Sequence, residues 1–166
     1  MPAKTVIDIE GSEAVSKVLL VLLNDFPGLS EDEVITFSSL DEESGIGFFP
    51  VSGAAIENER ETITGHVKQR CLYPFNITYR AAPRSDTQRM RIKEFLDALG
   101  KWLERHVVTL NGEEHRIEEY PILSSGNRKI KVISRSTPAY LMLAYASGVE
   151  DWNISMSLTY ENEFIR

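Results

Sequence analysis

Apolar residues recur every three or four positions in two segments of the chain, and this spacing predicts two helices with one buried face each. The first helix covers about residues 12–26, with an apolar stripe at Val15, Val18, Leu19, Leu22 and Phe26. Ser12 can cap its start, because a serine hydroxyl accepts hydrogen bonds from exposed backbone N–H groups. Pro27-Gly28 ends it, since proline cannot continue a helix and glycine tolerates a left-handed exit.

The second helix begins at a capping box, Ser85-Asp86-Thr87-Gln88, in which Ser85 is the N-cap and Gln88 reaches back. Its apolar stripe consists of Ile92, Phe95, Leu96, Leu99, Trp102 and Leu103. Gly100 lies inside this helix, where a glycine costs about 1 kcal/mol relative to alanine. We expect its missing side chain to permit close packing against a neighbouring element.

Two other segments alternate between apolar and polar residues, which predicts strands with one buried face. Residues 62–80 are expected to be a long β region, with Cys71, Tyr73, Phe75, Ile77 and Tyr79 on one face of its second half. Pro74 has no N–H to donate, which places this stretch at a sheet edge or a bulge. Residues 152–161 form the cleanest strand, with an apolar face made of Trp152, Ile154, Met156, Leu158 and Tyr160.

Shorter segments predict the remaining elements. Residues 34–38 and 47–51 are expected to be strands joined by an acidic hairpin loop at residues 39–45, and residues 54–60 a polar connection. Asn111-Gly112 predicts a tight turn within a loop-rich passage at residues 107–125. The other expectations are a strand at residues 127–134 with Ile130 and Val132 on one face, a strand or a helix at residues 138–146, and a turn at Ser147-Gly148.

The order of these elements is helix, strands, helix, strands. The simplest layered arrangement is a single α+β domain, residues 1–166, in which a mostly antiparallel β-sheet has two main helices packed on one face. The apolar stripes of the helices and the apolar face of the sheet then bury each other. The predicted core includes Leu19, Leu22, Phe75, Ile77, Phe95, Leu99, Ile154, Met156 and Leu158.

Charge and cysteine content narrow the class of protein. The formal net charge of the 166 residues is -7, so we expect no direct binding to nucleic acid and none to membranes. Cys71 is the single cysteine, which rules out an intrachain disulfide and fits a reducing compartment. The longest apolar run, residues 18–23, is too short to cross a bilayer, and the first ten residues lack the pattern of a secretory signal. We therefore expect the protein to stay in the cytoplasm until it is assembled.

Candidate catalytic groups are few. The three histidines, His66, His106 and His115, do not have the spacing of a metal motif, and we interpret them as exposed or capping residues. Cys71 with His66 is the one candidate nucleophile, but its place on the apolar face of a strand predicts a buried thiol. No glycine-rich phosphate motif and no nucleophile-elbow motif occurs. The sequence therefore predicts no enzyme activity, no cofactor and no metal.

Basic residues cluster around the start of the second helix, at Arg80, Arg84, Arg89, Arg91 and Lys93. They form either a solvated face that pairs with the chain's own acidic residues or a site for phosphate or nucleic acid. A positive patch on an acidic protein also suits self-association, with an acidic patch on a neighbouring copy as its partner. On that hypothesis the protein-interaction residues are Arg84 and Arg89 on one copy and Asp41, Glu42 and Glu43 on the next.

Three stretches carry a family resemblance: residues 72–83 (LYPFNITYRAAP), Gln88-Arg89 with residues 94–103 (EFLDALGKWL), and residues 158–164 (LTYENEF). They resemble small minor capsid proteins of tailed phages and prophages of Gram-positive bacteria. The helix–sheet–helix–sheet order of that group is similar to that of the tail terminators of long-tailed phages.

The resemblance implies a structural virion protein without enzyme activity, assembled in the cytoplasm of the bacterial host. It implies a ring of identical copies, usually six-fold, that caps the tail tube and connects it to the head. The implied partners are other copies of the chain, the phage tail tube protein and the head-completion or neck proteins. Three alternatives stay open: another minor capsid or neck protein, a monomeric protein-binding adaptor, and an enzyme that uses Cys71 with a histidine.

Overall fold

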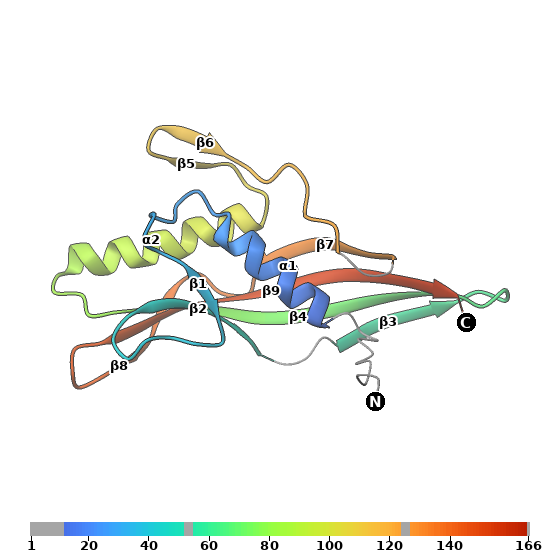
Figure 1. Ribbon diagram of the computed structural model, residues 1–166, viewed down its shortest axis with the longest axis horizontal. Helices are drawn as coiled ribbons and strands as arrows, with labels where there is room; N and C mark the ends of the chain where they lie inside the picture. The colour runs from blue at the N-terminus through green and yellow to red at the C-terminus, as the bar shows by residue number, and fades with distance from the viewer. Residues whose placement is uncertain (1–11, 52–54, 124–126, 166) are drawn as a thin grey trace, which may run out of the picture.

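The computed structural model describes residues 12–51, 55–123 and 127–165 (Figure 1). Within these residues the helices are α1 (Ser12–Asn24) and α2 (Asp86–Leu103). The strands are β1 (Ile35–Phe37), β2 (Gly45–Pro50), β3 (Ala55–Glu61), β4 (His66–Ala81), β5 (Val108–Leu110), β6 (Glu113–His115), β7 (Asn127–Arg135), β8 (Tyr140–Ala144) and β9 (Glu150–Ile165).

Two long central strands organise the sheet. β4 and β9 have 16 residues each and pair antiparallel along their whole length (Figure 1). The described residues form a seven-stranded sheet whose main order is β1-β2-β4-β9-β7. β2 and β3 pair with the two ends of β4 along the same side of it, and β7 and β8 pair with the two ends of β9 along the same side of it. All pairs in this sheet are antiparallel except β1 with β2. The predicted α+β class with a mostly antiparallel sheet is confirmed.

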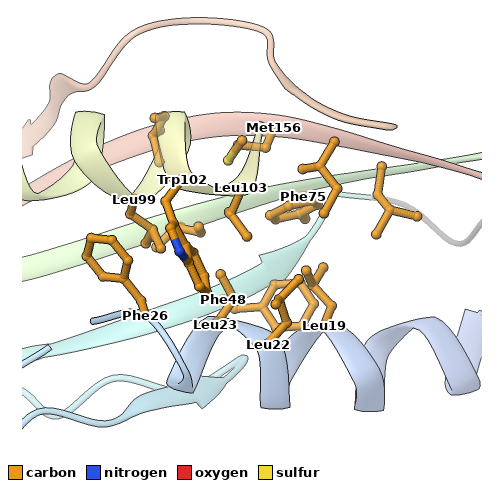
Figure 2. Close-up of a cluster of buried hydrophobic side chains, with 14 of the residues drawn as sticks. Leu19, Leu22, Leu23, Phe26, Phe48, Phe75, Leu99, Trp102, Leu103 and Met156 are labelled. Carbon is orange, nitrogen blue, oxygen red and sulfur yellow. The ribbon is translucent and has the colours of Figure 1, made fainter. Parts of the chain in front are cut away.

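Both helices cover the same face of this sheet. The hydroxyls of Ser16 in α1 and Tyr73 in β4 lie 2.6 Å apart, and the ring of Phe26 is 5.5 Å from that of Phe95 and 5.3 Å from that of Trp102. Figure 2 shows the α1 and α2 side chains meeting beside Phe48 and Phe75 of the sheet. Of the predicted core residues, Phe95 is half-buried and the others are buried: Leu19, Leu22, Phe75, Ile77, Leu99, Ile154, Met156 and Leu158.

The α2 helix follows its prediction closely. Ser85 is the N-cap, and its hydroxyl accepts a hydrogen bond from the Gln88 N–H at 3.3 Å. The Gln88 side chain accepts from the N–H of Arg84 at 2.5 Å rather than from Ser85, one residue beyond a standard capping box. A Cβ on Gly100 would lie 2.6 Å from Cδ of Arg135 and 2.8 Å from Cδ1 of Ile154. The expected close packing at Gly100 is confirmed.

The hairpin predicted at residues 39–45 is wrong, because β1 and β2 run parallel. Ser38 (φ 52°) and Gly45 (φ 129°) both have a positive φ, one at each end of the loop. The loop leads from the end of β1 back to the start of β2, so that the two strands run in the same direction. On its outer side the backbone of Ile35 is held by the side chain of Asn24, which accepts from its N–H at 2.8 Å and donates to its carbonyl at 3.0 Å. An amide at the end of α1 thus supplies partners for backbone groups of β1 that face away from β2.

The polar connection predicted at residues 54–60 is also wrong, since β3 occupies this stretch and pairs with β4 through a turn at residues 62–65. The side chains of residues 56–61 are all exposed, so the strand has no apolar alternation to reveal it. A register shift between Ile56 and Asn58 places Glu57 in a bulge. Edge strands of this polar kind are typical of sheets that avoid uncontrolled pairing.

Pro74 lies in the centre of the sheet rather than at an edge or a bulge, because β4 has neighbours on both sides. In an antiparallel strand the nitrogen and carbonyl of one residue point to the same side. The Pro74 carbonyl accepts from the N–H of Val51, just past the end of β2 and before β3 begins. The missing N–H therefore faces the junction between these two strands, where it interrupts no ladder.

Of the predictions for residues 107–146, the tight turn is confirmed and the shared face of Ile130 and Val132 is wrong. Asn111 (φ 52°) and Gly112 (φ 78°) form the tight turn between β5 and β6, and residues 138–146 contain a strand, β8. The shared face predicted for Ile130 and Val132 is wrong, since Ile130 is buried and Val132 is 45% exposed. A register shift between these two residues moves Val132 to the other face, and Ile133 takes the buried position instead.

Candidate interaction surfaces

The face of the sheet opposite the helices is lined at its centre mainly by polar side chains, together with Leu72 and Pro74 of β4. Its polar central positions alternate with the core residues of β4 and β9, and they are Asn76, Thr78, Asn153, Ser155, Ser157 and Thr159. We call these six residues with Ser134 of β7, which pairs with Ser157, the open face. Thr78, Asn153 and Thr159 are buried and the Ser157 hydroxyl is enclosed. The polar side chains that another protein could reach by hydrogen bonds are therefore Asn76, Ser155 and Ser134.

The side chains of the open face are bonded to one another across strands. Thr78 donates to Oδ1 of Asn153 at 3.1 Å, and Asn153 donates to the hydroxyls of Tyr140 at 3.1 Å and Ser155 at 3.3 Å. Asn153 is 1% exposed and Thr78 is 4% exposed. The network fixes the side chains of three strands, β4, β9 and β8, into one rigid polar surface.

A buried ion pair lies at the end of this face. Arg80 donates to both carboxylate oxygens of Asp151, at 2.7 and 2.9 Å, and Tyr145 donates to the same carboxylate at 2.9 Å. The bonds from Arg80 hold the pKa of Asp151 below its ordinary value, and the carboxylate raises the pKa of the Tyr145 hydroxyl. Arg80 also donates to the backbone carbonyl of Asp41 at 3.2 Å, which ties the acidic loop to the sheet.

The basic residues near α2 are mostly paired within the chain. Arg89 lies 3.0 Å from a carboxylate oxygen of Glu150 and 3.1 Å from one of Asp86, and Lys93 lies 2.6 Å from Asp97. The interpretation of a solvated face that pairs with the chain's own acids therefore fits Arg80, Arg89 and Lys93. Arg84 and Arg91 are exposed and make no side-chain ion pair within the described residues.

The predicted acidic and basic patches lie at the same end of the sheet. Asp41, Glu42 and Glu43 are exposed in the loop that leads into β2, whose first residue pairs with Arg80. Arg84 lies only four residues beyond Arg80. The structure thus brings the two patches to the same end of the sheet, where the backbone carbonyl of Asp41 is bonded to Arg80.

The groups considered for catalysis are dispersed. Cys71 is fully buried in the core, as predicted, and His66 and His106 are exposed. His66 lies 3.5 Å from Glu163 and His115 lies 3.9 Å from Glu113, both near the surface. In the described ranges no three histidine, cysteine, aspartate or glutamate residues are grouped so that they could hold a metal ion. No helix among the described residues has the length and apolar character needed to span a membrane.

Two surface cavities differ in charge. One of about 520 Å³ is lined by Asp32, Glu33, Asp41, Tyr79 and Arg80, together with apolar side chains. Tyr79 donates to Glu33 at 3.0 Å, and burial together with that carboxylate raises its pKa to about 12. The other, of about 410 Å³, is mainly basic and is lined by Arg105, Glu119, Tyr120, Pro121, Ile122, Arg128, Lys129, Ile130 and Lys131.

The sequence did not reveal that the apolar strand β8 is exposed. All five of its residues are exposed, including Tyr140, Leu141, Met142 and Leu143 at 40–46%. The signal was a run of large apolar residues without alternation, which a strand buried on both faces would also give.

Neither models of known protein families nor the sequences of curated proteins match this chain.

Proposed function

We propose that this chain is a structural assembly protein of a long-tailed phage, with a tail-terminator-like fold, that forms a ring on the tail tube and joins it to the head. The observation that carries the proposal is the open face, which neither helix covers (Figure 1) and on which Asn76, Ser155 and Ser134 reach solvent. The sequence resemblance at residues 72–83, 94–103 and 158–164 supplies the identity of the assembly.

Three features support an assembly role over an enzyme role. Cys71, the one candidate nucleophile, is buried among core residues. The Asp151 carboxylate is bonded to both Arg80 and Tyr145, so this ion pair offers no unpaired base or acid. The exposed apolar residues of β8 and the open face are surfaces of the kind that other proteins cover.

The test is tube assembly with the tail tube protein encoded in the same gene cluster. The protein is expected to bind one end of the tubes and to stop their elongation, so electron microscopy should show shorter tubes with added density at one end. The variant Ser134→Arg places a long charged side chain on the open face and should reduce end binding by about 10-fold or more. Its matched control is Val21→Arg, an exposed position on α1.

Tubes that elongate normally, with no bound protein, would contradict the tail-terminator role. A protein that instead binds purified head-completion proteins, and does so as a monomer or a ring, would support the alternative of another minor capsid or neck protein. A monomer that binds neither component would leave the monomeric adaptor as the better account.

A further inference from the structure

Two opposite edges of the seven-stranded sheet carry complementary side chains. One edge consists of β7 and β8, and the other of β1 and β3. We propose that the β7–β8 edge of one copy docks on the β1–β3 edge of the next copy, so that identical chains associate head to tail. This inference rests on the proposed function, because it names the contact by which the ring would form.

The β8 strand supplies the apolar half of the β7–β8 edge. Tyr140, Leu141, Met142 and Leu143 are 40%, 43%, 45% and 46% exposed, and Tyr145, just past the strand, is 39% exposed. In most strands one face is buried, but here consecutive side chains on both faces are in contact with water. A patch of this kind at a sheet edge marks a site of association.

The β1–β3 edge carries exposed apolar residues as well. Val34 (62% exposed) and Phe37 (47%) lie at β1, whereas Val51 (61%) lies just past the end of β2 and Ile56 (43%) lies in β3. Ile56 is level with Ile130 of β7 through Cys71 and Tyr160, so only Val34 and Phe37 lie in the half of this edge that is level with β8. Residues paired across neighbouring strands form a row that starts at Tyr140 in β8 and ends at Thr36 in β1. The row passes through Asn153, Thr78 and Gly47. The apolar strand β8 is therefore level with β1 on the opposite edge, although the two are separated by three strands within one copy.

The other half of each edge, β7 on one side and β3 on the other, carries charged residues. β7 has two arginines and two lysines and β3 has three glutamates and one arginine, but several of these side chains have partners within the chain: Lys131 with Glu161, Arg135 with Glu104 and Glu59 with Gln69. Lys129 and Glu57 are exposed and make no ion pair within the described residues, so the complementarity rests on these two. The row that starts at Lys129 passes through Glu161 and Arg70 and ends at Asn58, so β7 is level with β3. Two copies placed side by side in the same orientation would match basic with acidic and apolar with apolar.

The contact uses side chains rather than a continuous ladder of backbone hydrogen bonds. Asn24 occupies the outer backbone groups of Ile35 in β1, and Ile122 pairs with Lys129 on the outer side of β7. These two contacts prevent a neighbouring strand from pairing along the full edge. They also favour a defined register over open-ended strand addition.

Because the two surfaces are different and lie on opposite edges, the contact is heterologous, and each copy can bind two others. Such a contact closes into a ring when the rotation between copies allows it and otherwise continues as a filament. The pairing of Arg84 and Arg89 with Asp41, Glu42 and Glu43 of the next copy stays a separate prediction, since those residues lie at one end of the sheet and not on these two edges.

The experiment measures self-association by sedimentation velocity over a range of concentrations. Lys129→Glu and Glu57→Lys change exposed residues whose side chains make no ion pair within the described residues, so the fold should be unaffected. Each single variant should weaken association by roughly 3- to 10-fold, and the double variant should recover it, because the charges are then exchanged. The β8 variant Met142→Ser/Leu143→Ser should weaken association by about 10-fold or more.

Val21→Ser is the matched control, because Val21 is 64% exposed on α1 and lies on neither edge. Circular dichroism establishes that every variant is folded. If the wild-type chain oligomerises and the edge variants behave like Val21→Ser, the inference is overturned while the proposed function stands. If the single charge variants weaken association and the double variant does not recover it, β7 and β3 are not partners. A wild-type chain that stays monomeric throughout, and on tail tubes, would overturn the proposed function as well.

Discussion

Arg80 is the residue on which several parts of the molecule meet. Its guanidinium is bonded to the Asp151 carboxylate and the Tyr145 hydroxyl, lies 5.5 Å from the centre of the Tyr145 ring, and reaches the backbone of Asp41. It thereby connects β4, β9, the turn after β8 and the acidic loop. Because the Asp151 side chain is only 3% exposed, removing its charge leaves the guanidinium poorly compensated.

The substitution Asp151→Asn is expected to lower the free energy of unfolding at pH 7 by about 3 kcal/mol, measured by urea denaturation. The folded-state pKa of Asp151 lies below its unfolded value of about 3.9, so the carboxylate stabilises the fold fully above that pH and loses its effect as the pH falls through the folded pKa. The difference between wild type and variant should therefore shrink below about pH 4.

The control for this prediction is Asp86→Asn, which removes a carboxylate that is 87% exposed and pairs with Arg89. It should change stability by no more than about 0.5 kcal/mol. An equal effect of the two substitutions, or a difference from wild type that persists unchanged into strong acid, would show that the Asp151 ion pair does not stabilise the fold.

At the level of single elements, the packing of α2 against β7 and β9 explains why a glycine stands at position 100. Gly100 is a poor helix former, yet an added Cβ would come within 3 Å of Arg135 and Ile154 side-chain atoms. Arg135 is itself held at 2.6 Å by Glu104, and Ile154 is buried, so neither can move freely.

Gly100→Ala is expected to destabilise the protein by about 1 kcal/mol, because overpacking costs more than the gain in helix propensity. Thermal unfolding followed by circular dichroism checks this. A variant that is more stable than wild type by about 1 kcal/mol would mean that propensity dominates and that α2 does not pack closely on β7 and β9.

The elements also show what the sequence could and could not predict. Periodicity found α1, α2, β4 and β9, because each buries a regular stripe that appears directly in the spacing of apolar residues. It missed β3, whose exposed side chains leave no alternation, and the parallel pairing of β1 and β2, which Asn24 stabilises from outside the strands. The interaction surfaces were missed for a related reason: residues on opposite edges become level only through the register of the whole sheet.

At the scale of the whole molecule, the two faces of the sheet have different tasks. One face packs against both helices and supplies the core, with Leu19, Leu99 and Phe75 among its buried residues. The other is a bonded layer of amides and hydroxyls, and the edges beside it carry apolar and charged side chains. We therefore propose that the protein acts through its surfaces, by binding other proteins, rather than through a reactive centre.

On the proposed function, identical copies of this chain assemble through their surfaces into a closed ring. Native mass spectrometry of the purified chain at increasing concentration tests it most directly. The account predicts one oligomer of fixed copy number, which electron microscopy shows as rings and which high salt weakens. A monomer at every concentration, also in the presence of tail tubes, would contradict the account.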